Sequence, residues 1–242
     1  MPQTKRGKDG PGRKPGTIIR FEPGEIIITP DEAARYLGGS RYRPDKDLEK
    51  SVQDAISQAG RLACPAFIHA LHKVEETSPA GGLTLENGLF LDRPHAETGL
   101  EIRSLAACVF TLGGALEDTI HELSSRGDLL EAFILEAVGL ALMEALGDKC
   151  RQALGQKAKQ LKLFAGCAFG PGFRETPMEK QALLFQLVDA EAIGVRLTEN
   201  LMMRPLKSAS FFAAFSPAES KIKHVYKCRR CSMKNCLFRV EK

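Results

Sequence analysis

Three cysteines near the C-terminus, Cys228, Cys231 and Cys236, have the Cys-x-x-Cys-x4-Cys spacing of metal ligands. The first two thiolates can bind one metal ion or one cluster face, because the turn between them points both sulfurs the same way. Lysines and arginines flank the pattern, and their positive charge favours thiolates and offsets the negative charge of a thiolate-ligated centre. The spacing predicts an iron–sulfur cluster, with a zinc site and a tail without metal as the alternatives.

Three thiolates leave one ligand position to fill. His224, four residues before Cys228, would suit zinc, whereas Cys167 would complete an iron–sulfur cluster. We expect Cys167 to lie in a glycine-rich loop, where the backbone is free to turn a sulfur toward a metal. Two alternatives remain: a four-iron cluster can have one non-protein ligand, and Cys167 can be a small apolar residue without a metal. The other three cysteines lie in apolar surroundings and are expected to be core thiols: Cys64, Cys108 and Cys150.

The composition is that of a soluble protein. The 242 residues are 43% hydrophobic and 26% charged, with a net charge of +4 whose basic excess lies toward both ends. The most apolar run, Ala132 to Leu146, contains two glutamates and is too short to span a membrane. No signal-type apolar stretch follows the basic N-terminus, so we expect a cytoplasmic protein with reduced thiols. Three tyrosines and no tryptophan provide few side chains for stacking on bases, which argues against a nucleic-acid-binding role.

Three parts are predicted: a disordered basic tail at 1–16, one domain at 17–220, and a cysteine-rich tail at 221–242. Helices are expected at 30–37, 45–72 (kinked or broken at Pro65), 114–124, 128–159 and 177–194. Strands are expected at 17–21, 26–28, 83–91 (a pair turning at Asn87-Gly88), 103–111, 195–198 and 208–215. Helices and strands do not alternate regularly, which favours an α+β fold.

Three stretches carry a family resemblance. Residues 166–173 read Gly-Cys-Ala-Phe-Gly-Pro-Gly-Phe, 194–199 read Gly-Val-Arg-Leu-Thr-Glu, and 203–210 read Met-Arg-Pro-Leu-Lys-Ser-Ala-Ser. In this order they resemble the Arg-x-x-Pro-Gly-Tyr loop, the Gly-x-x-Leu-Thr-Glu-Ser strand and the Met-x-Pro-x-x-Ser-x-Ser turn of the activation domain of cobalamin-dependent methionine synthase. Arg35–Gly38, Thr111–Gly113 and the helix around Glu144 resemble stand-alone members, which often end in a Cys-x-x-Cys-x4-Cys tail. The resemblance covers residues 26–240.

This resemblance implies a twisted, mainly antiparallel sheet flanked by helices. It also implies an activator or accessory subunit of a corrinoid methyltransferase, within a methionine synthase-like methyl-transfer system. The partner would be a corrinoid protein that carries cobalamin. In the family, inactive cob(II)alamin is rescued by one-electron reduction coupled to methylation by S-adenosylmethionine.

The chain departs from the family where the methyl donor binds. Ala168 replaces the family's arginine, Phe173 replaces the loop tyrosine, and Ala214 or Phe212 replaces a second tyrosine. Alanine cannot bind a carboxylate as an arginine fork does, and losing such a contact costs about 2 to 5 kcal/mol. We therefore expect weak or absent binding of S-adenosylmethionine.

Four residues remain candidates for that site. Glu144 falls near a family glutamate that meets the methionine amino group, and is expected to be a partly buried carboxylate. The Pro171-Gly172 turn can present backbone amides, and Arg174 could reach the ligand's carboxylate across it. A non-catalytic, metal-stabilised partner-binding protein with a decayed donor site is the alternative function.

Overall fold

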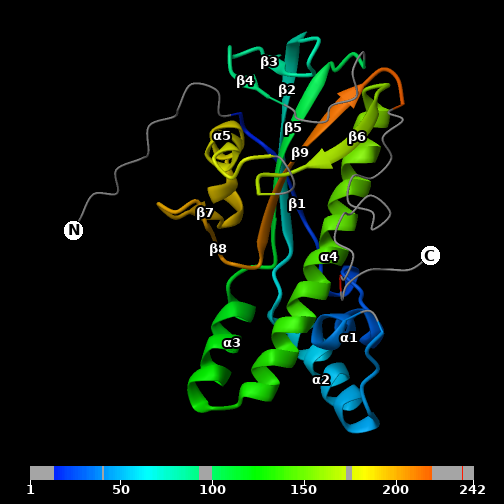
Figure 1. The fold of residues 1–242 in the computed structure, drawn as a ribbon, viewed down its shortest axis with the longest axis vertical. Coiled ribbons are helices and arrows are strands. Elements are labelled where there is room, and N and C mark those ends of the chain that lie inside the picture. The colour runs from blue at the N-terminus through cyan, green and yellow to red at the C-terminus, as the bar shows by residue number, and fades with distance from the viewer. Residues whose placement is uncertain (1–13, 40, 93–99, 173–175, 220–235, 237–242) are drawn as a thin grey trace.

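The computed structural model describes residues 14–39, 41–92, 100–172, 176–219 and 236. Its fold is α+β, as predicted, and is built on one antiparallel sheet (Figure 1). The sheet order is β4-β3-β2-β5-β9-β6, and β1 pairs with β2. Its strands are β1 (Thr17–Arg20), β2 (Ala66–Thr77), β3 (Leu83–Leu85), β4 (Phe90–Leu91), β5 (Ser104–Thr111), β6 (Phe164–Phe169) and β9 (Ser208–Ser216).

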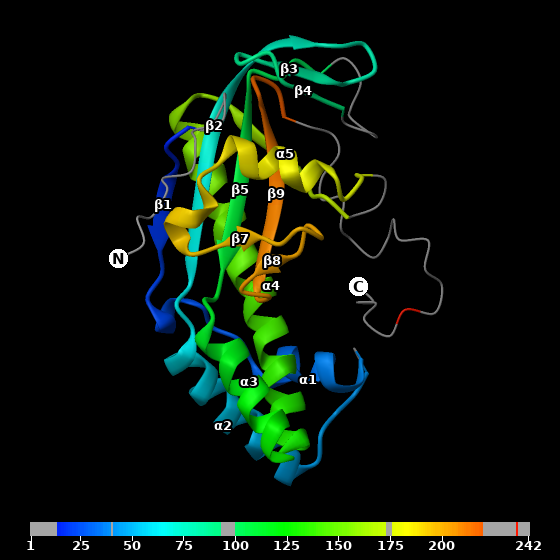
Figure 2. The same ribbon diagram turned by 90° about the vertical axis from the view of Figure 1, so that its left-hand side faces the viewer.

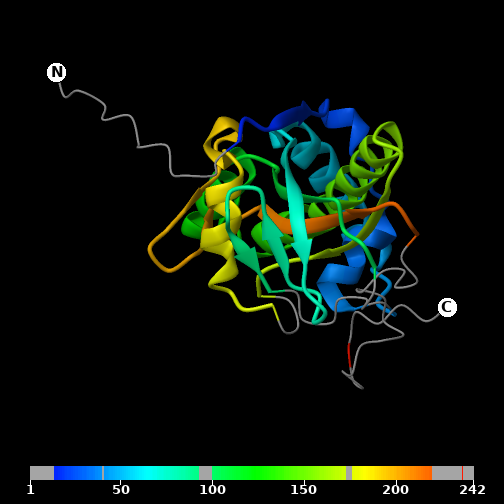
Figure 3. The ribbon, with the colours of Figure 1, turned by 90° about the horizontal axis from the view of Figure 1, so that it is seen from above.

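Helices lie on both faces of this sheet, and three of the five α-helices in the described residues pack mainly on the longest helix. They are α1 (Pro30–Gly38), α2 (Lys46–Leu62), α3 (Ala115–Arg126), α4 (Leu129–Gln160) and α5 (Lys180–Leu187), with the 3-10 helices η1 (Pro23–Glu25) and η2 (Ala190–Ile193). A small ribbon joins β7 (Arg196–Leu197) to β8 (Met203–Arg204). In Figure 2, α5 and this ribbon lie on one side of the sheet and α4 on the other; Figure 3 shows the same layers from above.

The two faces have separate cores. One contains residues of α1, α2 and α4 with Phe211 and Phe215 of β9, and the other contains residues of α5 and η2 with Phe212 of the same strand. Side chains alternate along a strand, so consecutive phenylalanines of β9 serve opposite cores. The central strands β2 and β5 are accordingly buried on both sides.

Several predicted elements are confirmed with their local causes. Helix α1 has a capping box in which the Glu32 amide donates to Thr29 Oγ1 and the Thr29 amide donates to Glu32 Oε2. Strands β3 and β4 pair across the Asn87-Gly88 turn, where Gly88 has a φ of +77°. The strand predicted at 103–111 is β5, and the long helix predicted at 128–159 is α4.

Two predicted elements are wrong. The helix expected at 45–72 ends at Leu62, and residues 66–77 form β2 instead. A strand buried on both faces is apolar on both faces, so its short apolar run resembles a buried helix. Residues 26–28 form no strand either: Ile26 and Ile28 are buried and Ile27 is exposed, which gives the alternation without a pairing partner.

The region 164–194 also differs from the prediction. The glycine-rich stretch expected as a loop contains β6, so the backbone of Cys167 lies in a strand. Helix α5 (Lys180–Leu187) is shorter than the helix predicted at 177–194. It begins three residues later and ends seven residues earlier. The Thr176 carbonyl, just before the residue where the helix was expected to begin, accepts a hydrogen bond from the Gly172 amide (2.9 Å). Within the described residues, no helix has the length and apolar character needed to cross a membrane.

Candidate functional site

A charged and aromatic cluster lies where α1 crosses α4. Arg35 Nη2 forms an ion pair with Glu144 Oε2, and the Tyr36 hydroxyl donates to the same oxygen at 2.9 Å. Arg35 Nη2 also donates to the Tyr36 hydroxyl (3.2 Å), and its guanidinium lies 5.1 Å from the centre of the Tyr36 ring. The cluster therefore joins two neighbours in sequence to a carboxylate from a distant helix.

The charges in this cluster stabilise one another. Burial alone would lower the pKa of Arg35, but the Glu144 carboxylate and the Tyr36 hydroxyl raise it, and the net shift is upward. Burial raises the pKa of Tyr36, and the Glu144 carboxylate raises it further. Arg35 is thus a cation and Tyr36 a neutral hydroxyl near neutral pH.

Glu144 is more exposed than the sequence predicted. Its side chain is 51% exposed, whereas that of Arg35 is 20% exposed. The prediction of a partly buried carboxylate is corrected: Glu144 is on the exposed side of α4, and α1 contacts it through hydrogen bonds to Oε2. Arg35 and Tyr36 were noted in the sequence only as part of a resemblance. Nothing in the local sequence indicates that they contact residue 144.

The edge strand β6 also packs against α4. Ala168 pairs with Ala213 of β9, after an irregularity of register between Ala165 and Ala168. Ala168 and Tyr36 both pack against the core cluster on the α4 side of the sheet. The methyl group of Ala168 therefore faces the same side as the cluster, but it carries no polar group.

The predicted Pro171-Gly172 turn follows directly after β6. Pro171 is buried, and Gly172 has a φ of +78°, in the region that favours glycine. A Cβ at residue 172 would lie 2.7 Å from Met178 Cε, so the flexible end of that methionine would have to shift. Phe173, at the position of the family's loop tyrosine, and the candidate Arg174 lie outside the described residues.

The positions of the second family tyrosine lie on the opposite face of the sheet. Ala214 and Phe212 belong to the core on the α5 side, and Phe212 packs against Phe169 with ring centres 5.4 Å apart. The sequence predicted that Ala168 and Ala214 belong to one methyl-donor site that has lost its polar residues. The strand register instead divides them between the two faces.

The predicted metal ligands are only partly described. Cys228, Cys231 and His224 lie outside the described residues, Cys236 is half-buried, and the side chain of Cys167 is outside what the structure describes. In the described part of the chain, no group of three histidine, cysteine or acidic side chains could hold a metal ion.

The remaining cysteines divide into two kinds. Cys108 and Cys150 are core thiols, as predicted, and burial raises the pKa of each. Cys64 is exposed, so its assignment to the core is corrected. It lies between the end of α2 at Leu62 and the start of β2 at Ala66.

Two acidic residues that the sequence analysis missed hold the Met203–Ser210 turn against the helices. Glu117 of α3 accepts hydrogen bonds from Arg204 Nη1 (2.8 Å) and the Leu206 amide (2.5 Å). Glu136 of α4 accepts one from the buried Lys207 at 2.6 Å. Arg204 and Lys207 in the Met203–Ser210 motif indicate that acidic partners exist, but the sequence does not show which acidic residues these are.

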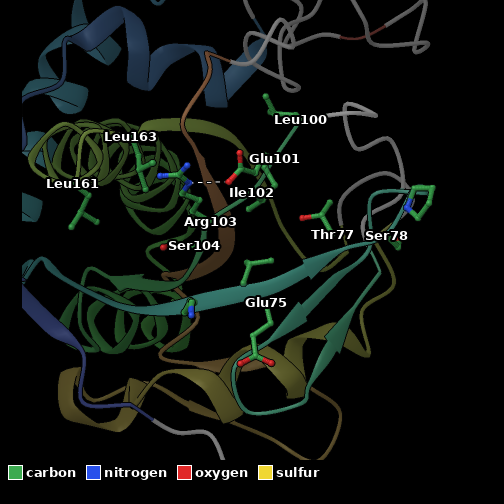
Figure 4. A pocket seen from close by; sticks show the side chains of 13 residues that line it. Glu75, Thr77, Ser78, Leu100, Glu101, Ile102, Arg103, Ser104, Leu161 and Leu163 are labelled. Atoms are coloured by element: carbon green, nitrogen blue, oxygen red, sulfur yellow. Dashed lines mark hydrogen bonds and ion pairs between the residues drawn. The ribbon is translucent and has the colours of Figure 1, made fainter.

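A cavity of about 840 Å³ lies at another place in the fold, between the end of β2 and the end of α4 (Figure 4). Leu161 and Leu163 form part of its apolar wall, and an exposed ion pair between Arg103 Nε and Glu101 Oε1 (2.9 Å) lies beside them. None of the residues predicted for a site lines this cavity.

Comparison with known proteins identifies the fold and the family. The family described as vitamin B12 dependent methionine synthase, activation domain, matches residues 96–239. A crystal structure of the MetH reactivation domain bound to AdoHcy has the same fold, with a TM-score of 0.62. It is 14% identical, over 89% of this chain and 82% of that chain. No curated protein sequence matches the chain.

Proposed function

The chain belongs to the family of activation domains of vitamin B12-dependent methionine synthase, and we propose that it activates a corrinoid methyltransferase. The observation that carries this proposal is the match over residues 96–239, more than half of the chain. That range includes Glu144, the β6 edge strand and the Pro171-Gly172 turn. The proposed substrate is cobalamin held by a partner protein, a corrinoid protein or a cobalamin-dependent methyltransferase.

The proposed reaction restores an oxidised corrinoid. One electron converts cob(II)alamin to cob(I)alamin, whose electron pair forms a bond to a methyl carbon as the carbon–sulfur bond of the donor breaks. If S-adenosylmethionine is the donor, the products are methylcobalamin and S-adenosylhomocysteine. The electron must come from a reductant, and the methyl transfer removes the reduced species and so draws the reduction forward.

The proposed donor site uses Glu144 and the turn after β6. The carboxylate of Glu144 would bind the ammonium group of an S-adenosyl compound, and Pro171-Gly172 would present backbone amides. Arg174 stays a candidate contact to the ligand's carboxylate. Because Ala168 offers no charged group on this face, we predict that the donor binds weakly.

We further propose that the C-terminal cysteines Cys228, Cys231 and Cys236 hold an iron–sulfur cluster, with Cys167 as the fourth ligand. Thiolate-ligated clusters reach low potentials, which suits delivery of an electron to cob(II)alamin. A zinc ion with His224 is the alternative, and would favour a partner-binding protein stabilised by metal.

Reconstitution tests the proposed function. The probe is a cobalamin-dependent methionine synthase fragment without its own activation domain, loaded with cob(II)alamin and mixed with a chemical reductant and S-adenosylmethionine. We expect methylcobalamin to form, by visible absorbance, faster with this protein than with an equal amount of serum albumin. Equal rates with both proteins, at several reductant potentials, would overturn the proposal.

A further inference from the structure

We infer that Arg35 of α1 binds the carboxylate of an amino-acid zwitterion whose ammonium group binds Glu144. The inference deepens the proposed function and rests on it, because it names the residue that takes the place of the missing β6 arginine. The ligand class is an S-adenosyl compound with its α-amino-acid end intact.

The first argument is the unused hydrogen-bonding capacity of the pair. Arg35 and Tyr36 both contact Oε2 of Glu144, and Oε1 has no hydrogen-bond partner among the described residues. Toward the described residues, the Arg35 guanidinium donates hydrogen bonds from Nη2 alone, and its buried Nε has no partner there. A buried donor without an acceptor is uncommon in a folded protein, and its partner is then an ordered water, an ion or a bound ligand.

The second argument is charge. An amino-acid zwitterion has one cation and two carboxylate oxygens within a few bonds, and the α1–α4 cluster has the complementary anion and cation side by side. A guanidinium is the side chain best suited to a carboxylate, because its donors form a fork. The free Oε1 of Glu144 can accept from an ammonium group without displacing Tyr36.

The third argument is position. Tyr36, next to Arg35, packs on the same core cluster as Ala168, and α4 contacts both α1 and β6. Arg35 on α1 and a residue at position 168 are therefore on the same side of the sheet. An arginine on the α5 side, such as one placed at Ala214, would be separated from Glu144 by the sheet.

Ligand binding by calorimetry or by NMR titration tests the inference, with two probes. S-adenosylhomocysteine has the amino-acid end, and methylthioadenosine has the same nucleoside thioether without it. We expect the intact protein to prefer S-adenosylhomocysteine by at least about tenfold, a difference of about 1.4 kcal/mol. Equal affinity for both probes, or no S-adenosylhomocysteine binding at millimolar concentration, would overturn the inference.

Variants then identify the residue. Arg35→Ala should lower S-adenosylhomocysteine affinity at least about tenfold and leave methylthioadenosine affinity unchanged. Arg35→Lys keeps the charge and the ion pair with Glu144 but lacks the fork, so it should also lose affinity. A matched control is Arg151→Ala, which removes another ion pair of α4, to Asp148, and should change neither affinity. Unchanged affinity in Arg35→Ala would mean that the ion pair only fastens α1 to α4, and increased affinity would mean that Arg35 blocks Glu144.

The two proposals fail separately. Thermal denaturation of each variant shows whether it is folded. If Arg35→Ala does not fold, the affinity of Arg35→Lys decides the test. If the protein reactivates cob(II)alamin but binds ligand independently of Arg35, only the inference fails. If binding depends on Arg35 and no reactivation occurs, the proposed function fails.

Discussion

The buried imidazole of His72 donates a hydrogen bond from Nε2 to the main-chain carbonyl of Leu187 (2.9 Å), which ties β2 to the last residue of α5. Its Nδ1 is buried without a partner in the described residues. On the opposite face of β2, both ring nitrogens of the buried His69 also lack a partner there. Burial lowers the pKa of His72, and burial together with Lys157 lowers that of His69 to about 4.

These two histidines predict a loss of stability in acid. The unfolded chain binds protons as the pH falls below about 6.5, the ordinary histidine pKa, whereas the folded protein keeps both rings neutral. The free energy of unfolding should therefore fall by up to ~1.4 kcal/mol per pH unit for each histidine between pH ~6.5 and the folded pKa. Urea denaturation at a series of pH values measures it.

Variants separate this effect from other titrations. His72 also has the Lys14–Glu86 ion pair nearby: Lys14 lowers its pKa further and Glu86 opposes that shift. His72→Gln removes the titration and should flatten the pH dependence, whereas the same change at the exposed His121 is the control. An unchanged slope in folded His72→Gln would contradict the prediction.

Replacing Thr29 by alanine should destabilise α1. The Thr29 hydroxyl accepts a hydrogen bond from the Glu32 amide, and loss of such a cap costs about 1 kcal/mol. Chemical denaturation of the variant measures the change. Thr119→Ala on α3, whose hydroxyl only bonds back to the Ala115 carbonyl, should stay within about 0.5 kcal/mol of the unmodified protein. Equal effects in the two variants would show that the cap is not a significant source of stability.

Ala168→Arg should strengthen the binding of S-adenosyl ligands. The change returns a guanidinium to the β6 position that faces the α4 side, and a charged contact of this kind is worth about 2 to 5 kcal/mol. Calorimetry should show weaker than micromolar binding in the unmodified protein and at least about tenfold tighter binding in the variant. Ala168→Gln, similar in reach but uncharged, should gain little. Tight binding without any substitution would refute the idea of an eroded site.

The C-terminal cysteines are expected to hold metal when the protein is purified without oxygen. Cys231→Ser should remove the bound metal, measured as iron and zinc per chain, because one of three clustered thiolates is lost. Cys64→Ser, at an exposed cysteine far along the chain from the tail, is the control and should keep it. A brown protein with iron supports the cluster, and a colourless one with zinc supports the His224 alternative. Full metal content in Cys231→Ser would exclude this residue as a ligand.

Cys167→Ala tests the proposed fourth ligand. If Cys167 ligates the cluster, the variant should contain less iron and reduce the corrinoid more slowly. If both measurements match those of the unmodified protein, the fourth position belongs to another ligand. The side chain of residue 167 is small in both forms, so the substitution should leave β6 intact.

The sequence was sufficient where the determining contacts are local. The start of α1 follows from Thr29, Pro30 and Glu32, whose capping bonds span three residues. The β3–β4 pair follows from Asn87-Gly88, because only a few conformations reverse a chain within a short turn. The mixed order of these elements was enough to predict the α+β class.

Tertiary structure decided the rest, because the deciding contacts join residues far apart in the chain. Residues 66–72 have an apolar pattern that fits a helix, and pairing with β1 and β5 makes them a strand. Which face Ala168 and Ala214 occupy depends on the register between β6 and β9. The partner of Glu144 is set by the packing of α1 on α4, and no local pattern around residue 35 or 144 specifies a contact across that distance.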